Sequence, residues 1–489
     1  MGEAKKRGNR ELRVTEAIKR NKNAFVRAIG VVDDNDPVRH MLQAGLKPFM
    51  DRMTKEQWQA RRARLLDALR AHPANTTKLT EAQSVRVRED EMGWYLFLCE
   101  QELEDPMCND SSQALRILPF FAGLGCRWQY AHRVAGIEKK LDALLKDYRK
   151  EPDGLLFELL VALSYAAEGW DVEFIDEGQR KTADLRVTRD EREFYVECKR
   201  MARTTDYSVK ERNAFLRLWD AGKSVLFNNG QWIWFNGTFH VEPTDLQEGF
   251  LRNLWRASLP ISEGEHVLLN NEQAIIRARL INQERVHQHL SKFRVKAHSP
   301  AFVQLLGEDW APDDASVTLL NKISISHVAG CEAQVLGTYV EQVAFACGFT
   351  REFDSEPSIN KKAKDVIKLL SDAVKQLPED KPSIIHVAAE TMEGAEVERR
   401  RSEKVQASVP AFYLGKPVAL IRLHRFQAHQ RATMSFELDE AIDDFQMPYY
   451  DLENIPATVV VPPGGRPKCG GHWDLNLNGT NEKDLGLYD

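Results

Sequence analysis

In the first half of the chain the pattern of apolar and polar residues changes from a helical period to an alternating one. Residues 154–167 (GLLFELLVALSYAA) are apolar almost throughout and predict a helix, in which Glu158 is the one charged residue. Residues 183–187 (ADLRV) and 193–199 (EFYVECK) are short and rich in Val, Leu, Phe and Tyr, so they predict two strands. A helix followed by a pair of strands is therefore expected here.

The charged residues between these two strands predict a tight hairpin. If the turn is centred on residues 190–191, Val187 pairs with Phe194 and the pairing continues outward in the same register. That register sets Asp184 directly opposite Glu197. Two carboxylates would then face one another at one end of a two-stranded ribbon.

This pair of acids needs a compensating positive charge, because like charges directly opposite each other destabilise a sheet. Side chains alternate along a strand, so Glu197 and Lys199 share a face whereas Cys198 points the other way. Lys199 offsets part of the repulsion, and a divalent cation would offset more. Mg²⁺ prefers oxygen ligands, keeps several waters and usually takes one or two protein carboxylates together with phosphate oxygens.

We therefore interpret these residues as a site for Mg²⁺ or Mn²⁺ that hydrolyses phosphodiesters. Asp184, Glu197 and the backbone carbonyl of Cys198 are the candidate ligands. Lys199 would orient or deprotonate a water, or neutralise charge on the phosphate. Glu158 would hold a second metal or a metal-bound water. Each acid alone also fits a plainer role, such as a turn cap or a solvent-facing residue, and it is the ordered set that favours catalysis.

The same residues resemble the PD-(D/E)xK nuclease superfamily, which has the restriction-endonuclease-like fold. Glu158 matches the acid on the first helix, Asp184 the acid that opens the second strand, and Glu197 with Lys199 the acid-x-Lys pair on the third. Ala183 replaces the proline that names the motif, a position that often varies in the superfamily. The resemblance implies an α/β protein with an αβββαβ core, a large α+β insertion and a helical N-terminal region. It also implies a metal-dependent nuclease in which Glu158, Asp184, Glu197 and Lys199 are catalytic.

The remaining patterns divide the chain into five parts. They are a mostly helical region (1–149), the first part of the core with the site (150–202), an α+β insertion (203–355), the remainder of the core with added strands (356–461), and an irregular tail (462–489).

Within these parts, further elements follow from apolar spacing and from strand-forming residues. The expected strands are 169–175, 224–229, 231–241, 266–270, 382–390, 417–424 and 431–439. The expected helices include 273–293, 333–349 and 361–378. In the superfamily core, a helix and a strand follow the acid-x-Lys strand, and residues 361–378 and 382–390 would supply them.

Composition and charge limit the classes of protein and the cellular locations that fit this chain. The net charge of −6 argues against a protein that coats nucleic acid by bulk charge, although basic residues can act locally. Arg180, Lys181 and Arg200 flank the proposed site and are the candidate phosphate contacts. No apolar run is long enough to span a bilayer, residues 1–10 lack the apolar stretch typical of a signal peptide, and the seven cysteines lack metal or disulfide spacing. We expect a cytoplasmic protein with no membrane partner.

The leading hypothesis is thus a divalent-metal-dependent nuclease acting on DNA. The resemblance suggests a setting in anti-phage or mobile-element defence. Two alternatives stay open: a non-cleaving nucleic-acid-binding or scaffold protein that retains the fold, and a nuclease that cleaves RNA. A homo-oligomer is also open. No Walker A loop occurs in the sequence, so any ATP-driven movement would need a separate ATPase partner.

Overall fold

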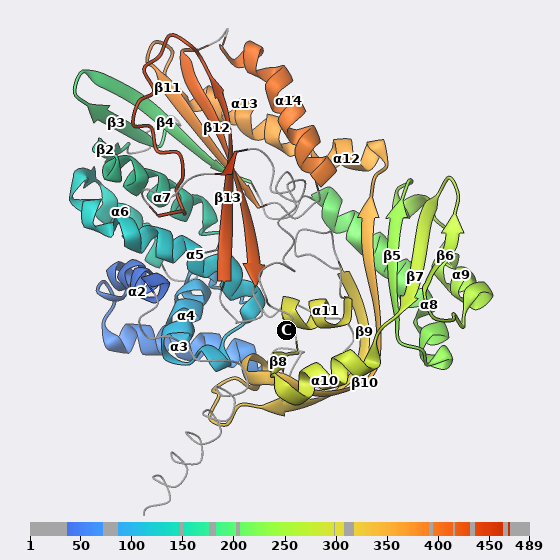
Figure 1. Cartoon of the computed structure of the whole chain (residues 1–489). Helices are drawn as coiled ribbons and strands as arrows, with labels where there is room; N and C mark the ends of the chain where they lie inside the picture. The colour runs from blue at the N-terminus through green and yellow to red at the C-terminus, as the bar shows by residue number, and fades with distance from the viewer. Residues whose placement is uncertain are drawn as a thin grey trace, which may run out of the picture.

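A computed structural model describes residues 37–71, 87–146, 150–175, 182–201, 206–297, 299–307, 317–390, 395–413, 416–430, 436–462 and 468–469. In these ranges helices and strands are mixed and the strands form two sheets, which confirms the α/β class (Figure 1). No helix in the same ranges is long and apolar enough to cross a membrane.

The larger sheet has the strand order β1-β2-β3-β4-β11-β12-β13-β14. Its strands are β1 (Val134–Ala135), β2 (Asp171–Phe174), β3 (Leu185–Arg189), β4 (Arg192–Arg200), β11 (Ser383–Glu390), β12 (Val418–Gln430), β13 (Phe436–Gln446) and β14 (Lys468–Cys469). Strands β2, β3 and β4 pair antiparallel, whereas β11 lies parallel to both β4 and β12. The strands expected around residues 169–175, 382–390 and 417–424 are thereby confirmed, and so is the part of 431–439 from residue 436 on, because residues 431–435 lie outside the described residues.

Helices cover both faces of this sheet. They are α5 (Ser111–Arg127) and α7 (Asp153–Ala167) on one face, and α13 (Asp365–Gln376) and α14 (Ala395–Tyr413) on the other. Strand β11 shows the division, because Ile384 and Ala388 join the core of α5 and α7 while Ile385 and Val387 join that of α13. A strand buried on both faces is apolar at nearly every position, which is why its sequence was recognisable.

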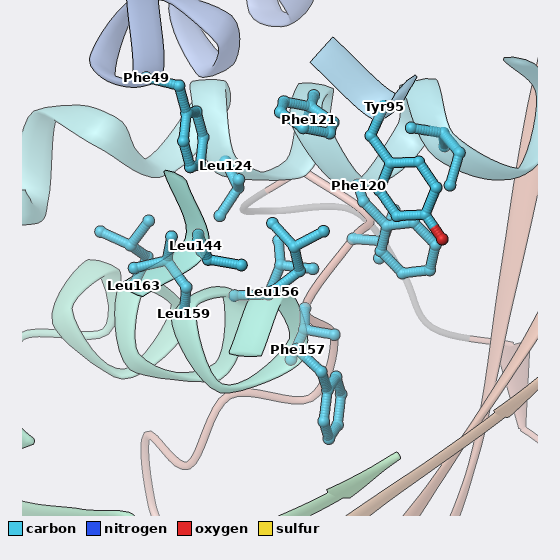
Figure 2. Packing of buried hydrophobic residues seen from close by; sticks show 14 of the residues in the cluster. Phe49, Tyr95, Phe120, Phe121, Leu124, Leu144, Leu156, Phe157, Leu159 and Leu163 are labelled. Atoms are coloured by element: carbon cyan, nitrogen blue, oxygen red, sulfur yellow. The ribbon is translucent and has the colours of Figure 1, made fainter. Parts of the chain in front are cut away.

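The helical region at residues 37–145 supplies many buried residues of the core that α5 and α7 share with the sheet. Its helices are α2 (Pro37–Met50), α3 (Lys55–Arg70), α4 (Glu91–Glu104) and α6 (Ile137–Leu145), with two short 3₁₀ turns, η3 (Pro106–Cys108) and η4 (Trp128–Arg133). Helix α3 begins with a capping box formed by Thr54 and Gln57. Figure 2 shows leucines of α5 and α7 pointing toward one another, with Phe49 of α2 and Leu144 of α6 beside them.

The described residues between 206 and 353 form a second sheet with its own core. The strand order is β6-β7-β5-β10-β8, and β9 pairs with β10. Its strands are β5 (Ile233–Phe239), β6 (Glu265–Asn270), β7 (Ala274–Leu280), β8 (Val295–Lys296), β9 (Val317–His327) and β10 (Thr338–Phe353). Its helices are α8 (Asp206–Asn229), α9 (Phe250–Ser258), α10 (Gln283–Lys292) and α11 (Pro300–Gly307), with the 3₁₀ turns η5 (Pro243–Asp245) and η6 (Gln334–Gly337). The core is aromatic, and Trp219, Trp234 and Trp255 are almost fully buried.

Three secondary-structure predictions in this part were wrong. Residues 224–229 are not a strand but the end of α8, since buried Leu226 continues the helical spacing that begins at Phe215. Residues 274–280 are not helical but form β7, where Ala274, Ile276 and Ala278 alternate inward. The helix that follows starts at its Asn282 cap.

The third error concerns β10, which occupies most of the helix predicted at 333–349. The pairing of β10 with β9 shifts register twice, between Val340 and Gln342 and between Val343 and Phe345. Each irregularity breaks the alternation of inward and outward side chains. The resulting spacing of apolar residues imitates a helix. A smaller correction applies to 361–378, where α12 (Glu356–Lys362) ends before α13 begins.

Candidate active site

The β3–β4 hairpin has the predicted turn and register. The turn lies at residues 190–191, and Asp190 adopts a left-handed conformation with φ of 55°, which aspartate tolerates better than most residues. Val187 pairs with Phe194, and the last pair of the ladder joins Leu185 to Val196. Asp184 and Glu197 are the next residues outward, so the hairpin brings these two acids to the same end of the ribbon.

Asp184 is held against the backbone of β4. Its Oδ2 accepts a hydrogen bond from the backbone N–H of Cys198 at 2.7 Å. Burial and the negative charge of Glu158 raise the pKa of the Asp184 carboxyl to about 7, although the Cys198 N–H, Lys199 and Lys140 act in the opposite direction. The two positive charges nearby therefore do not compensate fully for a carboxylate at this position.

Glu197 is completely buried. Its Oε1 forms an ion pair with Nζ of Lys199, while Oε2 accepts no hydrogen bond from the described residues. Burial and the charge of Asp184 raise the pKa of Glu197 to about 8, against the effect of Lys199. Burying a carboxylate oxygen that receives no hydrogen bond lowers the stability of the folded protein. A further cation bound here would therefore offset negative charge that Lys199 alone does not compensate.

Glu158 lies on α7, the helix that packs against β4. Its Oε2 pairs with Nζ of Lys140 on α6 at 2.5 Å, and its charge acts on both Asp184 and Glu197. Lys140 also lies over the ring of Phe174 on β2, with Nζ 4.9 Å from the ring centroid. Lys140 could not be predicted from the sequence, because it is one of two adjacent lysines on an amphipathic helix and only the packing of α6 distinguishes it.

The acids and the lysine are close enough to influence one another electrostatically, but they do not form a complete coordination shell. Among the described residues no three His, Cys, Asp or Glu side chains gather closely enough to hold a metal ion. Mg²⁺ commonly takes only one or two protein carboxylates and completes its octahedron with water and phosphate oxygens. The donor-free Oε2 of Glu197 and the excess negative charge beside Asp184 fit such a cation.

The three candidate phosphate contacts have different positions. Arg180 and Lys181 lie outside the described residues. The side chain of Arg200 is 5% exposed, donates to Oε1 of Glu390 at 2.5 Å, and lies over the ring of Phe426. Its guanidinium therefore belongs to a buried ion pair, and contact with a phosphate would require that pair to open.

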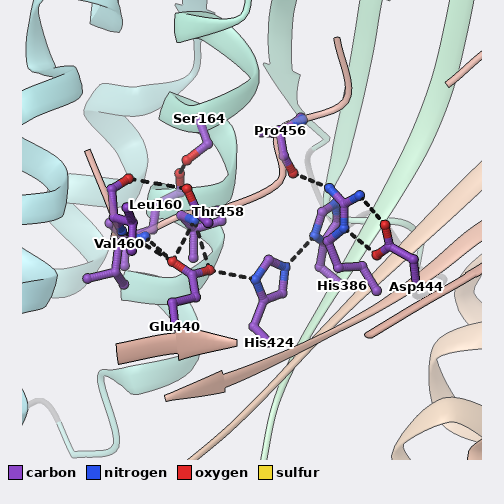
Figure 3. A network of polar contacts seen from close by, with 12 residues as sticks. Leu160, Ser164, His386, His424, Glu440, Asp444, Pro456, Thr458 and Val460 are labelled. Atoms are coloured by element: carbon purple, nitrogen blue, oxygen red, sulfur yellow. Dashed lines mark hydrogen bonds and ion pairs between the residues drawn. The ribbon is translucent and has the colours of Figure 1, made fainter. Parts of the chain in front are cut away.

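A buried chain of polar contacts connects α7 with the sheet behind the site, and Figure 3 shows its part from His386 through His424 to Glu440. The hydroxyl of Tyr165 on α7 contacts Nε2 of His386 at 3.0 Å, and Nδ1 of His386 contacts Nε2 of His424 at 2.8 Å. His424 in turn contacts Oε1 of Glu440 on β13 at 2.7 Å. His386 pairs with Cys198 across β11 and β4, so this chain helps to fix the helix of Glu158 relative to the strand of Glu197.

No family model, no curated protein and no solved structure gives a significant match to this chain.

Proposed function

We propose that the protein is a divalent-metal-dependent nuclease with a restriction-endonuclease-like core and that DNA is its substrate. The observation that carries the proposal is the placement of Asp184 beside Glu197, both with raised pKa values, on a hairpin that also carries Lys199. The element order supports it. Helix α7, the antiparallel strands β2, β3 and β4, helix α13 and the parallel strand β11 occur in the order of an αβββαβ core, with the second sheet and α12 inserted between β4 and α13.

Asp184, Glu197 and the backbone carbonyl of Cys198 would hold the cation. The cation would supply Lewis-acid polarisation of the phosphate and acidification of a bound water. Neutralising Glu197 would release Lys199 from its ion pair, and the ammonium would then be available to orient the water or to stabilise charge on the phosphate. Glu158, held by Lys140, would accept a hydrogen bond from that water.

Cleavage assays with Lys199→Ala test this assignment. Purified protein is incubated with linear, circular and single-stranded DNA and with RNA, in Mg²⁺, in Mn²⁺ and in EDTA. We expect cleavage of DNA that requires metal, and a loss of about 100-fold or more in Lys199→Ala, since a positioned acid–base or electrostatic group contributes at least that much. The matched control is Arg186→Ala, which removes a half-exposed cation from the neighbouring strand and should leave the rate unchanged.

The same assay separates the other functions. Cleavage of RNA but not of DNA would show that RNA is the substrate. Metal-independent binding without cleavage of any substrate would favour a scaffold that retains the fold. Metal-dependent cleavage that persists in both Lys199→Ala and Asp184→Ala would overturn the site.

Stability in the absence of metal should fall as the pH rises from about 4 to about 8 and should then level off. The folded-state pKa values of Asp184 and Glu197, about 7 and about 8, lie above their ordinary values of 3.8 and 4.5. Folding therefore takes up protons in this range, and the stability that these protons supply is lost as the pH passes through the folded-state pKa values. Mg²⁺ replaces the protons, so its stabilising effect should grow with pH.

Thermal unfolding in EDTA and in Mg²⁺ across this pH range measures the effect. In Glu197→Gln, one of the two titrating groups is absent, so the pH dependence should become shallower. A Mg²⁺ effect of equal size at all pH values would contradict a cation bound by these two carboxylates.

A further inference from the structure

Two cysteines from distant parts of the sequence meet where the N-terminal helical region contacts the second sheet. Cys108 ends the 3₁₀ turn η3, and Cys331 lies just before η6. Both belong to a small apolar cluster with Met107, Val328 and Tyr339. The hydroxyl of Tyr339 donates to the backbone carbonyl of Met107 at 3.0 Å, so this contact is specific and not merely apolar.

Cys331 packs against the apolar cluster that contains Cys108, so the two thiols lie in one small group of side chains. Cys108 is 2% exposed, whereas Cys331 is only partly buried and therefore accessible to a small oxidant. Cys331 Sγ also lies 3.1 Å from the backbone carbonyl of Ala333, to which its thiol donates. One buried thiol thus faces one accessible thiol.

Lys296 of β8 fixes the two segments that carry these cysteines. Its buried ammonium donates to the carbonyl of Asn109, the residue after Cys108, and to the carbonyl of Leu336 in η6 at 2.8 Å. The neighbouring Cys108 lowers the pKa of the Cys331 thiol, and the charge of Lys296 acts in the same direction although burial opposes it. Thiolates are the reactive form of cysteine, and a neighbouring lysine favours them.

We propose that Cys108 and Cys331 form a reversible disulfide when the protein meets a peroxide. The Cys331 thiolate attacks one oxygen of hydrogen peroxide and breaks the O–O bond. The sulfur becomes a sulfenic acid, and the released hydroxide takes a proton and leaves as water. The Cys108 sulfur then attacks the sulfenic sulfur, forms the S–S bond and loses its proton, while the sulfenic oxygen leaves as a second water. The two cysteines supply the two electrons that reduce the peroxide.

The disulfide would join the helical region to the second sheet by a covalent bond in addition to the Lys296 contacts. A bond between residues so far apart in the sequence restricts the unfolded chain strongly, and the folded state already holds both cysteines in one cluster. Oxidation should therefore raise the thermal stability of the protein without changing its fold. This inference is independent of the nuclease site.

Peptide mass spectrometry tests the proposal on the full-length protein. The protein is treated with hydrogen peroxide, its free thiols are alkylated, and it is then digested without reductant. We expect a peptide pair that joins Cys108 to Cys331 and that dithiothreitol separates. We also expect the midpoint of thermal unfolding to rise by about 5 °C on oxidation.

Variants provide the comparison. Cys331→Ser and Cys108→Ser should each remove both the cross-linked peptide and the thermal shift. The matched control is Cys126→Ser, whose partly buried sulfur contacts the carbonyl of Gly123 and the guanidinium of Arg127, and which should keep both effects. Recovery of Cys108 and Cys331 as separately alkylated or over-oxidised peptides after peroxide treatment of the unsubstituted protein would overturn the proposal, whatever the variants do.

Discussion

Asp184→Asn is expected to lower metal-dependent cleavage by about 1,000-fold or more and at the same time to stabilise the metal-free protein. The amide oxygen of asparagine can still accept the hydrogen bond from the Cys198 backbone, so the hairpin should keep its geometry. What is lost is the negative charge that binds a cation. Cleavage rates in Mg²⁺ measure the first effect, and urea unfolding in EDTA measures the second.

The gain in stability follows from the charge balance. Burial and the negative charge of Asp184 raise the pKa of Glu197 to about 8, so at higher pH the two carboxylates repel each other in a poorly solvated place. Removing one of them should raise the free energy of unfolding in EDTA by about 1–2 kcal/mol above pH 7. Below the folded-state pKa values the gain should shrink, because the carboxyls are then protonated.

Asp190→Asn is the matched control for this substitution. Asp190 lies in the turn of the same hairpin, its side chain is largely exposed, and asparagine also tolerates the left-handed conformation found there. It should alter neither the cleavage rate nor the stability in EDTA. If Asp184→Asn lost activity together with stability, Asp184 would be a structural residue and its proposed role as a metal ligand would be wrong.

The hairpin could be predicted because its signals are local. A two-residue turn fixes the register of the strands beside it, and alternation then assigns each side chain to a face. That is enough to set Asp184 beside Glu197. The same reasoning failed for β10, where two irregularities in the pairing with β9 disturb the alternation. A bulge depends on the partner strand, so a single sequence does not reveal it.

The surroundings of the site depend on long-range packing and were less accessible to prediction. Lys140 pairs with Glu158 because α6 packs beside α7, and Arg200 is buried because Glu390 and aromatic rings surround it. In both pairs the two residues are much further apart in the sequence than one helical turn or one strand repeat. The local sequence pattern predicted the acids and the lysine of the site. The charged groups that pair with site residues, such as Lys140, could be identified only in the tertiary structure.

Glu440 is the residue whose loss should destabilise the large sheet most. Glu440→Ala is expected to lower the free energy of unfolding by about 3–5 kcal/mol. The carboxylate is buried and accepts hydrogen bonds from His424 and from the backbone N–H groups of Val459, Val460 and Val461. Alanine would leave these donors without an acceptor in the interior.

The pKa of Glu440 shows how favourable this environment is for a negative charge. Burial alone would raise the pKa, but the hydrogen bonds from His424 and from the backbone amides bring it below its ordinary value. A carboxyl with a lowered folded-state pKa contributes stability that is present above its unfolded pKa and lost as the pH falls through the folded one. The destabilisation by Glu440→Ala should accordingly be largest near neutral pH and decrease in acid.

Urea unfolding of Glu440→Ala, Glu440→Gln and Glu453→Ala measures the effect. Glutamine keeps one acceptor oxygen for the donors of the C-terminal segment but not the charge, so its loss should be intermediate. Glu453 is exposed on the same segment, and its replacement should change the free energy of unfolding by less than about 0.5 kcal/mol. The polar chain from Glu440 through His424 and His386 ends at Tyr165 on the helix of Glu158. Equal stability of Glu440→Ala and Glu453→Ala would show that this chain does not hold the helix against the sheet.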